Sequence, residues 1–343
     1  MTATSFNGSG ALPEGYTVRP PTEGDIPAII RLMHDCDVAF KPDATLDYTP
    51  DDIQGDWQSL ALARDAWVVL APNSTLAGYE TIIDEGSGVL AMDGYVHPQH
   101  TGRGIGSALV ELAEARAAEL IARAPNGARV SLQAGVLPED TSACQMLAER
   151  GYDNIHTFWR MRIDMTEPPP APQWPEGITL RTFQPGQDER AVFDAVEEAF
   201  SDHWGHVPRE YEEWIARFQR PDSDPLLVWL AFAASTGAGQ PEASEALAGV
   251  ALCRQQPEQG WVNTLAVRRP WRRRGLGMAL LLHAFGEFYR RGERKVGLGV
   301  DAQSLTGATR LYEAAGMRPV MTIFTYSKEL RAGVDMSVQE LGE

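Results

Sequence analysis

The chain carries one residue pattern twice, with the copies about half its length apart. Five identities fall within a window of 14 residues, and the order of the expected helices and strands is also kept. The matching pairs are Val96 and Val267, Gly104 and Gly275, Gly106 and Gly277, Ala108 and Ala279, Leu109 and Leu280, and then, at a shorter interval, Ala143 and Ala308, Gly151 and Gly316, Thr157 and Thr322. Such self-similarity is typical of a tandem duplication, and 343 residues suffice for two domains.

A proline-rich segment separates the two copies. Residues 166–177 read TEPPPAPQWPEG and hold five prolines, which remove backbone donors and prevent a regular helix or sheet ladder. We therefore expect an N-terminal domain at residues 16–165, a semi-rigid linker at 166–177, a C-terminal domain at 178–330 and a loose tail at 331–343.

Composition excludes several classes of function. Cys36, Cys144 and Cys253 lie far apart and lack the spacing of metal ligands, so we expect reduced thiols and no metal. The first 15 residues do not resemble a signal peptide, and no apolar run is long enough to cross a membrane. A net charge of −17 argues against a nucleic-acid partner. These features together predict a cytoplasmic protein without a membrane partner.

The stretch from Thr264 to Leu280 reads TLAVRRPWRRRGLGMAL and indicates a strand, a turn and a helix. The glycines of the turn let the backbone approach a ligand, and the N-terminus of a helix attracts anions. The arginines can add charge-assisted bonds to phosphate. A basic run of this kind also fits a nucleic-acid or localisation patch. Its place between an apolar strand and a Gly-x-Gly helix start favours a diphosphate site for a nucleotide-bearing cofactor.

Both copies resemble the GNAT (Gcn5-related N-acetyltransferase) superfamily, and the resemblance covers nearly the whole chain. The family motif Arg/Gln-x-x-Gly-x-Gly/Ala is matched in full at Arg272, Gly275 and Gly277. A later signature, Ala-x-x-x-Tyr-x-x-x-Gly, is matched at residues 308–316, with Tyr312 in its central place. The layout looks similar to that of two-domain members of the family, such as mycothiol synthase.

The first copy departs from the family pattern at two places. Thr101 stands where the family has Arg or Gln, although Gly104 and Gly106 are kept, and Leu147 stands where the tyrosine is expected. We therefore expect the second copy to be catalytic. The first copy would bind coenzyme A at most, or serve a structural purpose.

The resemblance implies an α/β (α+β) fold of two tandem GNAT domains. Each would have a mixed, mostly antiparallel central sheet flanked by helices, with a V-shaped splay for acetyl-CoA as co-substrate. The cofactor-binding residues implied in the second copy are Leu265, Ala266, Val267, Arg272, Arg273, Arg274, Gly275, Leu276 and Gly277. Those implied in the first copy are Tyr95, Val96, Thr101, Gly102, Arg103, Gly104, Ile105 and Gly106.

Acetyl transfer to an amine makes three chemical demands. The amine must lose a proton, the oxyanion needs a donor such as a backbone N–H near Val267, and the departing thiolate needs an acid. The resemblance makes Tyr312 the general acid. The general base stays open, and the candidates for it or for substrate contact are Asp202, His203, His206 and Asp301, with Trp204 as an aromatic wall.

These features predict an N-acetyltransferase whose acceptor is the primary amine of a small molecule. Two alternatives stay open at this point. The chain fits a non-catalytic protein that senses acetyl-CoA, and it also fits an enzyme that acetylates proteins.

Overall fold

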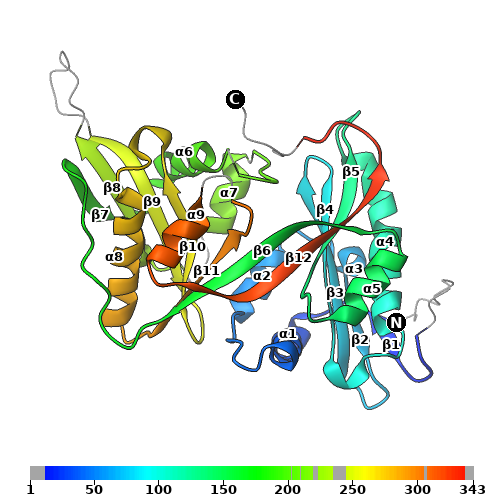
Figure 1. Ribbon diagram of the computed structural model, residues 1–343. Helices are drawn as coiled ribbons and strands as arrows, with labels where there is room; N and C mark the ends of the chain where they lie inside the picture. Colours follow the sequence, from blue (N-terminus) through cyan, green and yellow to red (C-terminus); the bar gives the residue numbers. More distant parts are fainter. Residues whose placement is uncertain are drawn as a thin grey trace. The chain divides into compact units, whose positions relative to one another are not determined.

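The computed structural model describes residues 12–201, 203–208, 210–218, 223–234, 245–304 and 307–336. The chain divides into two compact units (Figure 1). Unit 1 comprises Met1–Thr157 and Met321–Met336, and unit 2 comprises Phe158–Val320 and Ser337–Glu343. The sequence boundaries at 16–165 and 178–330 remain our proposal for the extent of each repeat.

Unit 1 is a mixed sheet with helices on both faces. Its strand order is β1-β2-β3-β4-β5-β12, and every neighbouring pair is antiparallel except β4 and β5. The strands are β1 (Thr17–Arg19), β2 (Ala66–Leu70), β3 (Leu76–Gly86), β4 (Val89–Val96), β5 (Val130–Val136) and, from Met321 onward, β12 (Arg318–Arg331). The helices are α1 (Ile26–Phe40), α2 (Pro50–Trp57), α3 (Leu62–Asp65), α4 (Ile105–Leu120) and α5 (Thr141–Glu149).

Unit 2 repeats this plan. Its strand order is β6-β11-β10-β9-β8-β7, with one parallel pair, β10 and β11. The strands are β7 (Ile178–Thr182), β8 (Val228–Ala234), β9 (Glu245–Gln255), β10 (Gly260–Val267), β11 (Lys295–Asp301) and, from Phe158 onward, β6 (Asp153–Asp164). The helices are α6 (Glu189–Phe200), α7 (Tyr211–Phe218), α8 (Leu276–Arg290) and α9 (Ala308–Ala314).

The helices of unit 2 cover opposite faces of the sheet because side chains alternate along each strand. Ala251 and Leu298 face α8, whose Leu280 and Phe285 are fully buried there. The neighbouring residue Val250 faces the other way and packs with α6 and α7. Two apolar layers therefore enclose the sheet that carries the parallel strand pair.

The two units exchange their last strands. β6 comes before the proline-rich linker in sequence, yet it pairs with β11 from Asp164↔Lys295 to Phe158↔Asp301. β12 comes at the end of the chain and pairs with β5 of unit 1. Each unit therefore contains a strand from the other sequence repeat. The sheet of unit 2 is complete only when residues before the linker are present.

A β-bulge distinguishes β10 from its counterpart β4. The register between β9 and β10 shifts between Val262 and Thr264, which leaves Asn263 as the extra residue. The register of β3 and β4 shifts only near the start of β4, between Asp84 and Gly86. A bulge bends its strand and redirects the backbone groups beside it, and bulges are common next to active sites.

The sequence from Thr49 to Ala63 predicts one helical segment, but the structure has two helices here. α2 ends at Trp57, and the single turn α3 begins at Leu62. The carboxylate of Asp65 explains the break. It accepts a hydrogen bond from the backbone N–H of Ala61 at 2.8 Å, and it forms an ion pair with Arg116 at 2.7 Å. These contacts form a separate turn where the sequence pattern predicts a continuous helix.

Candidate active site

The turn between β10 and α8 presents free backbone donors at a helix N-terminus. Gly275 adopts a left-handed conformation with φ of 85° as the N-cap of α8. The first backbone bond of the helix runs from the Ala279 N–H to the Gly275 carbonyl at 3.0 Å. The N–H groups of residues 276–278 precede that bond and point out of the helix, where the helix dipole also favours an anion.

Gly277 lets the start of α8 lie close to α9 and β10. A Cβ at this position would lie 3.1 Å from Cδ1 of Leu311 and 3.7 Å from Cγ2 of Val267. Gly106 has the same surroundings in unit 1, where a Cβ would lie 3.6 Å from Val96 and 3.9 Å from the sulfur of Met146. In both copies the first helical turn therefore packs closely against the preceding strand and the following helix.

Arg273 holds an unusual backbone conformation in the same turn. Its φ is 61°, a left-handed value that costs a non-glycine residue about 1–2 kcal/mol. The matching residue of unit 1 is Gly102, with φ of 71°. Left-handed residues next to a helix start turn successive N–H groups toward one point, which forms an anion-binding concavity. The side chains of Arg273 and Arg274 are exposed beside it.

Arg272, the first residue of the motif, ties the turn to the rest of unit 2. Its Nε donates to the carbonyl of Val267 at 3.1 Å, and a terminal nitrogen donates to the carbonyl of Ala199 at 3.0 Å. Nearby, Glu198 accepts a 2.6 Å ion pair from Arg268. These bonds join the end of β10 to the end of α6. Phosphate binding by the Arg272 side chain remains a prediction, whereas its fixing of the turn is observed.

The remaining predicted cofactor residues of unit 2 belong to the core. Ala266 and Leu276 are buried, and Leu265 pairs with Ala251 across the sheet. Their side chains pack, so only their backbone groups are placed to contact a ligand in the splay.

Tyr312 lies on α9 within the same apolar cluster as α8. Its side chain is 9% exposed, and burial raises its pKa to about 12. The phenol therefore stays protonated at every ordinary pH and can donate a proton or a hydrogen bond. The matching position of α5 holds Leu147, which is buried among apolar residues.

The candidate acceptor-side residues fall into two groups. Trp204 packs edge-on against Phe158 with ring centroids 6.1 Å apart, and Phe158 pairs across the sheet with Asp301. The structure thus brings Trp204 and Asp301 to the same end of β11. The Asp301 carboxylate accepts a bond from the backbone N–H of Gln303 at 2.7 Å, so it also caps the following turn.

The two histidines lie beside the end of α6 instead. His203 packs on Phe200 with ring centroids 4.3 Å apart, and Nε2 of His206 lies 3.3 Å from the Glu197 carboxylate. Asp202 lies outside the described residues. Glu197 is not among the residues that the sequence singles out, because the helical pattern of α6 gives a partly buried glutamate no distinguishing signal.

The turn between β4 and α4 in unit 1, called the cradle below, has the same backbone conformation as the turn at Gly275 but different surroundings. Gly104 is the N-cap of α4 with φ of 80°, and the N–H of Ala108 donates to its carbonyl at 3.0 Å. Thr101 bonds the carbonyl of Pro98 at 3.0 Å and replaces the arginine. Arg103 is exposed and Ile105 is buried in the core.

The tyrosine predicted beside this cradle faces away from it. Tyr95 packs with Tyr79 and α1 on one face of the sheet, whereas Val96 packs with α4 on the other. Alternation along β4 thus leaves only the backbone of Tyr95 available to a ligand on the α4 side.

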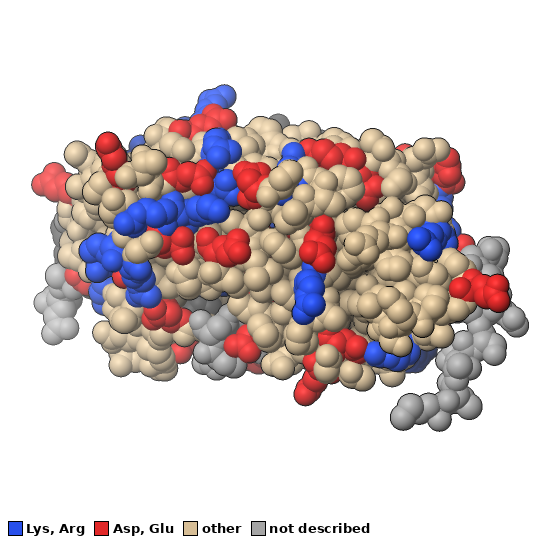
Figure 2. All heavy atoms as spheres, turned by 90° about the horizontal axis from the view of Figure 1, so that it is seen from below, with Lys and Arg blue, Asp and Glu red and all other residues tan. Residues whose placement is uncertain are grey.

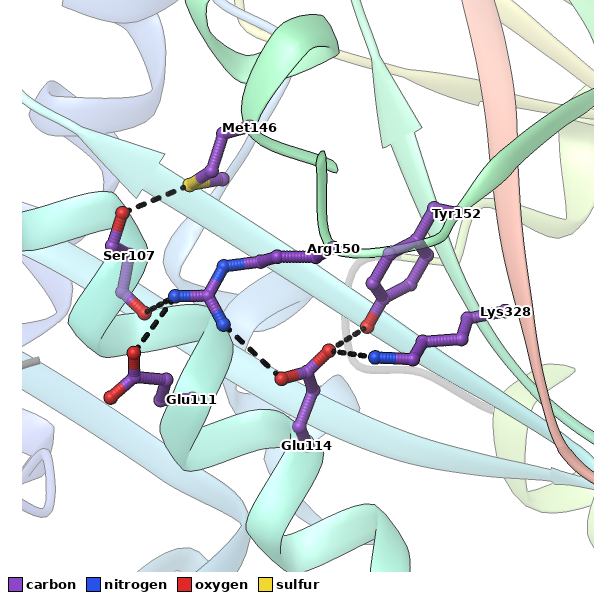
Figure 3. A network of polar contacts seen from close by, with 7 residues as sticks. All are labelled: Ser107, Glu111, Glu114, Met146, Arg150, Tyr152 and Lys328. Carbon is purple, nitrogen blue, oxygen red and sulfur yellow. Dashed lines mark hydrogen bonds and ion pairs between the residues drawn. The ribbon is translucent and has the colours of Figure 1, made fainter. Parts of the chain in front are cut away.

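A polar network joins α4 and α5 in unit 1 (Figure 3). Arg150 donates to the Ser107 carbonyl at 3.2 Å and forms ion pairs with Glu111 at 2.9 Å and Glu114 at 3.3 Å. Lys328 of β12 adds an ion pair to Glu114 at 2.9 Å. Tyr152 also donates to Glu114, and Ser107 to the sulfur of Met146.

Unit 2 has apolar residues at the corresponding places. The repeat intervals align Glu111 with Leu282, Glu114 with Phe285 and Arg150 with Ala315. The polar network is therefore particular to unit 1, while the helices beside Tyr312 pack through a continuous apolar core.

Comparison with known proteins agrees with this arrangement. The model of the Acetyltransferase (GNAT) family matches the chain twice, at residues 26–152 and 190–317. The chain belongs to the GNAT acetyltransferase family. It is an acyltransferase with two tandem GNAT domains, and the sequence prediction of family and fold is confirmed.

Related GNAT proteins cover most of the chain. The mycothiol acetyltransferase of Thermobispora bispora is 33% identical over 261 residues, covering 73% of this chain and 79% of the relative. The mycothiol acetyltransferase of Salinispora arenicola is 32% identical over 258 residues, covering 72% of this chain and 76% of the relative.

Solved structures also match over most of the chain. A GCN5-related N-acetyltransferase from Sphaerobacter thermophilus is 39% identical, with a TM-score of 0.79 over 95% of this chain and 99% of the other. A tandem GNAT protein from the clavulanic acid biosynthesis pathway is 20% identical, with a TM-score of 0.64 over 93% of this chain and all of the other. The latter shows the shared fold.

Two features are absent from the described residues. No helix among them is both long and apolar enough to cross a membrane. No cluster of three or more histidine, cysteine, aspartate or glutamate side chains in that part of the chain is arranged to hold a metal ion.

Proposed function

We propose that this GNAT protein transfers the acetyl group of acetyl-CoA to the primary amine of a small molecule, with the chemistry in unit 2. The observation that carries the proposal is that three features lie together on β10 and the helices beside it. β10 has its bulge at Asn263, its end leads into the helix N-terminus at Gly275, and Tyr312 is buried on the adjoining helix.

The residues present fit acetyl-CoA. The outward N–H groups at the start of α8 suit the diphosphate, and the exposed Arg273 and Arg274 suit further phosphate. The parallel pairing of β10 with β11 ends at Trp261↔Gly297. From there the β10 backbone as far as Val267 is available to pair with the pantetheine arm.

The reaction then needs few further groups. The neutral amine attacks the thioester carbonyl, and a backbone N–H of β10 beside the bulge stabilises the oxyanion. The carbon–sulfur bond breaks, and Tyr312 donates the proton that neutralises the departing thiolate. The proton lost by the amine leaves through solvent or through a group on the α6–α7 side, where His206 and Glu197 form a pair.

Unit 1 supports a secondary function at most. Leu147 replaces the proposed acid, and β4 carries no bulge at the position of Asn263. The cradle at Gly104 keeps the geometry for a diphosphate. We therefore assign catalysis to unit 2 alone.

The small-molecule acceptor is supported by the relatives that are named mycothiol acetyltransferases. Release of the coenzyme A thiol with a panel of small amines tests the proposal. We expect turnover with at least one amine. The Gly275→Val variant should lose this turnover, whereas the Gly104→Val variant should keep it. Tight acetyl-CoA binding without transfer to any small amine or peptide would contradict it and favour an acetyl-CoA sensor.

A further inference from the structure

Two glycines on β11 of unit 2 lie across from two arginines on β6. Gly299 pairs with Arg160 and Gly297 pairs with Arg162. Leu298, between the glycines, packs with α8, so the alternation of side chains places the glycines and arginines on the opposite face, that of α6 and α7. This is the face away from the Gly275 turn and Tyr312.

The two glycines differ in what covers them. A Cβ at Gly297 would lie 2.7 Å from the ring of Trp261, which rests on that glycine. A Cβ at Gly299 would meet nothing within 4 Å, and Gly299 is exposed. The lack of a side chain at Gly299 therefore leaves an open position, which is called the hollow below. Trp261 covers the neighbouring glycine on one side of it, and Phe158, in contact with Trp204, belongs to the next strand pair on the other side.

The hollow lies beside the proposed site of transfer. The pairing of β10 with β11 ends at Trp261↔Gly297, so Gly299 is two residues into the splay. The bulge residue Asn263 lies two residues into the splay on β10 and is exposed. A ligand over Gly299 therefore lies at the gap through which an amine would meet the thioester.

Unit 1 has the same pairing between β5 and its edge strand β12, but without the arginines. Gly135 is exposed and pairs with Thr325, in the same way as Gly299 is exposed and pairs with Arg160. The pair of Gln133 and Ser327 in unit 1 corresponds to the pair of Gly297 and Arg162 in unit 2. The cationic side chains thus distinguish the unit that carries Tyr312 from the unit that does not.

The arginines give this hollow its chemical character. Arg162 is 7% exposed on its side chain and is fixed by the Asp164 carboxylate at 3.2 Å. Arg160, which is partly buried, borders Gly299 directly. A guanidinium has five donors in a planar fork, so it can bind a carboxylate or phosphate while it also contacts the protein.

We propose that the hollow at Gly299 is the acceptor subsite and that Arg160 binds an anionic group on the acceptor. The preferred substrates are then amines that carry a carboxylate or a phosphate. This inference rests on the proposed function, because it specifies the acceptor of the same reaction. Arg160 acts in binding and takes no part in proton transfer.

Matched acceptors test the proposal on the full-length protein. Amino acids and their amides differ in the carboxylate, and phosphoethanolamine and ethanolamine differ in the phosphate. We expect kcat/KM to be at least about tenfold higher for the anionic member of one pair, because hydrogen bonds to charged groups are stronger than those between neutral groups. The pair that shows the preference identifies the source of the anion.

Substitution of Arg160 supplies the decisive comparison. Arg160→Gln should raise the KM for the anionic acceptor about tenfold and leave the KM for acetyl-CoA and the rate with the neutral acceptor unchanged. Thr325→Gln is the control at the matching place in unit 1. Gly299→Val should raise the KM for every acceptor, whereas Gly135→Val should not.

The outcomes separate the two proposals. Transfer to neutral and anionic amines with equal efficiency, or a preference that survives Arg160→Gln, would overturn the anionic subsite while leaving the acetyltransferase intact. The absence of transfer to any amine would overturn the proposed function and this inference with it.

Discussion

The carboxyl group of Glu80 lies directly over the backbone of Gly94. The two residues pair across β3 and β4, and a Cβ on Gly94 would lie 2.2 Å from the nearer carboxyl oxygen. The matching pair in unit 2 is Ala251 and Leu265. Unit 1 therefore fills with a carboxyl group the place that unit 2 fills with an apolar side chain.

Glu80 should make the stability of unit 1 depend on pH. The side chain is 2% exposed, its Oε1 has no hydrogen-bond partner within the described chain, and burial, reinforced by Asp93, raises its pKa well above the ordinary value. The native state then holds a proton that the unfolded state releases above about pH 4.3. The contribution of Glu80 to stability is therefore fully present below that pH and is lost as the pH rises through the native pKa.

Glu80→Gln should remove this dependence. The variant should gain stability over the natural protein by up to about 1.4 kcal/mol for each pH unit above 4.3, until the native pKa is reached. Denaturant unfolding between pH 5 and 8 measures the difference. Glu149→Gln, an exposed site on α5, is the control. A constant difference across this range would show that Glu80 is ionised in the native protein.

The repeat and its glycine turns were predictable from the sequence because each follows from a local rule. Gly104 and Gly275 both have positive φ at a helix N-cap, a conformation that strongly favours glycine. A strand–glycine–helix pattern therefore locates both turns. The family and fold class followed from the same motifs and are confirmed.

The partners of the strands were not predictable in this way. An apolar strand pattern indicates a strand but does not specify which edge it joins, so the exchange of β6 and β12 had no local signal. The bulge at Asn263 likewise depends on the register with β9. The orientation of the Arg272 side chain was not predictable either. It donates to the carbonyls of Val267 and Ala199, at the ends of β10 and α6, and only the tertiary fold brings these two ends together.

The strand exchange predicts that cutting the linker will not separate the two halves. A protease site inserted within residues 166–177 would be cleaved in the folded protein, yet β6 stays paired with β11 and β12 with β5. The two fragments should therefore co-elute in size-exclusion chromatography and keep acetyltransferase activity.

The same exchange predicts that residues 166–343 alone will not form a stable unit 2. This fragment lacks β6, so β11 loses its neighbour along its whole length and exposes a bare edge. We expect aggregation, measured by light scattering, whereas residues 150–343 should be more soluble. A monomeric, cooperatively folded 166–343 fragment would contradict the exchange.

Arg273 should trade stability for phosphate binding. Arg273→Gly removes the cost of the left-handed conformation and should raise the free energy of unfolding by about 1 kcal/mol. It also removes a positive charge beside the helix start, so the Kd for acetyl-CoA should rise about fivefold at low salt, since a surface charge contributes about 1 kcal/mol. Gly102→Arg is the reciprocal control in unit 1 and should lower stability without changing turnover. Unchanged acetyl-CoA affinity in Arg273→Gly would remove this arginine from the phosphate site.

Tyr312→Phe isolates the proposed acid, because it removes one hydroxyl from a buried ring and keeps the apolar packing. We expect kcat to fall by about 10²–10⁴, the usual contribution of general acid catalysis, while the Kd for acetyl-CoA changes less than twofold. Burial raises the Tyr312 pKa to about 12, so the natural protein should show no loss of kcat from its ionisation below about pH 11. Tyr326→Phe removes a hydroxyl from a buried tyrosine of unit 1 and should leave kcat unchanged. An equal loss in both variants would indicate a structural effect, and full activity in Tyr312→Phe would assign protonation of the thiolate to solvent.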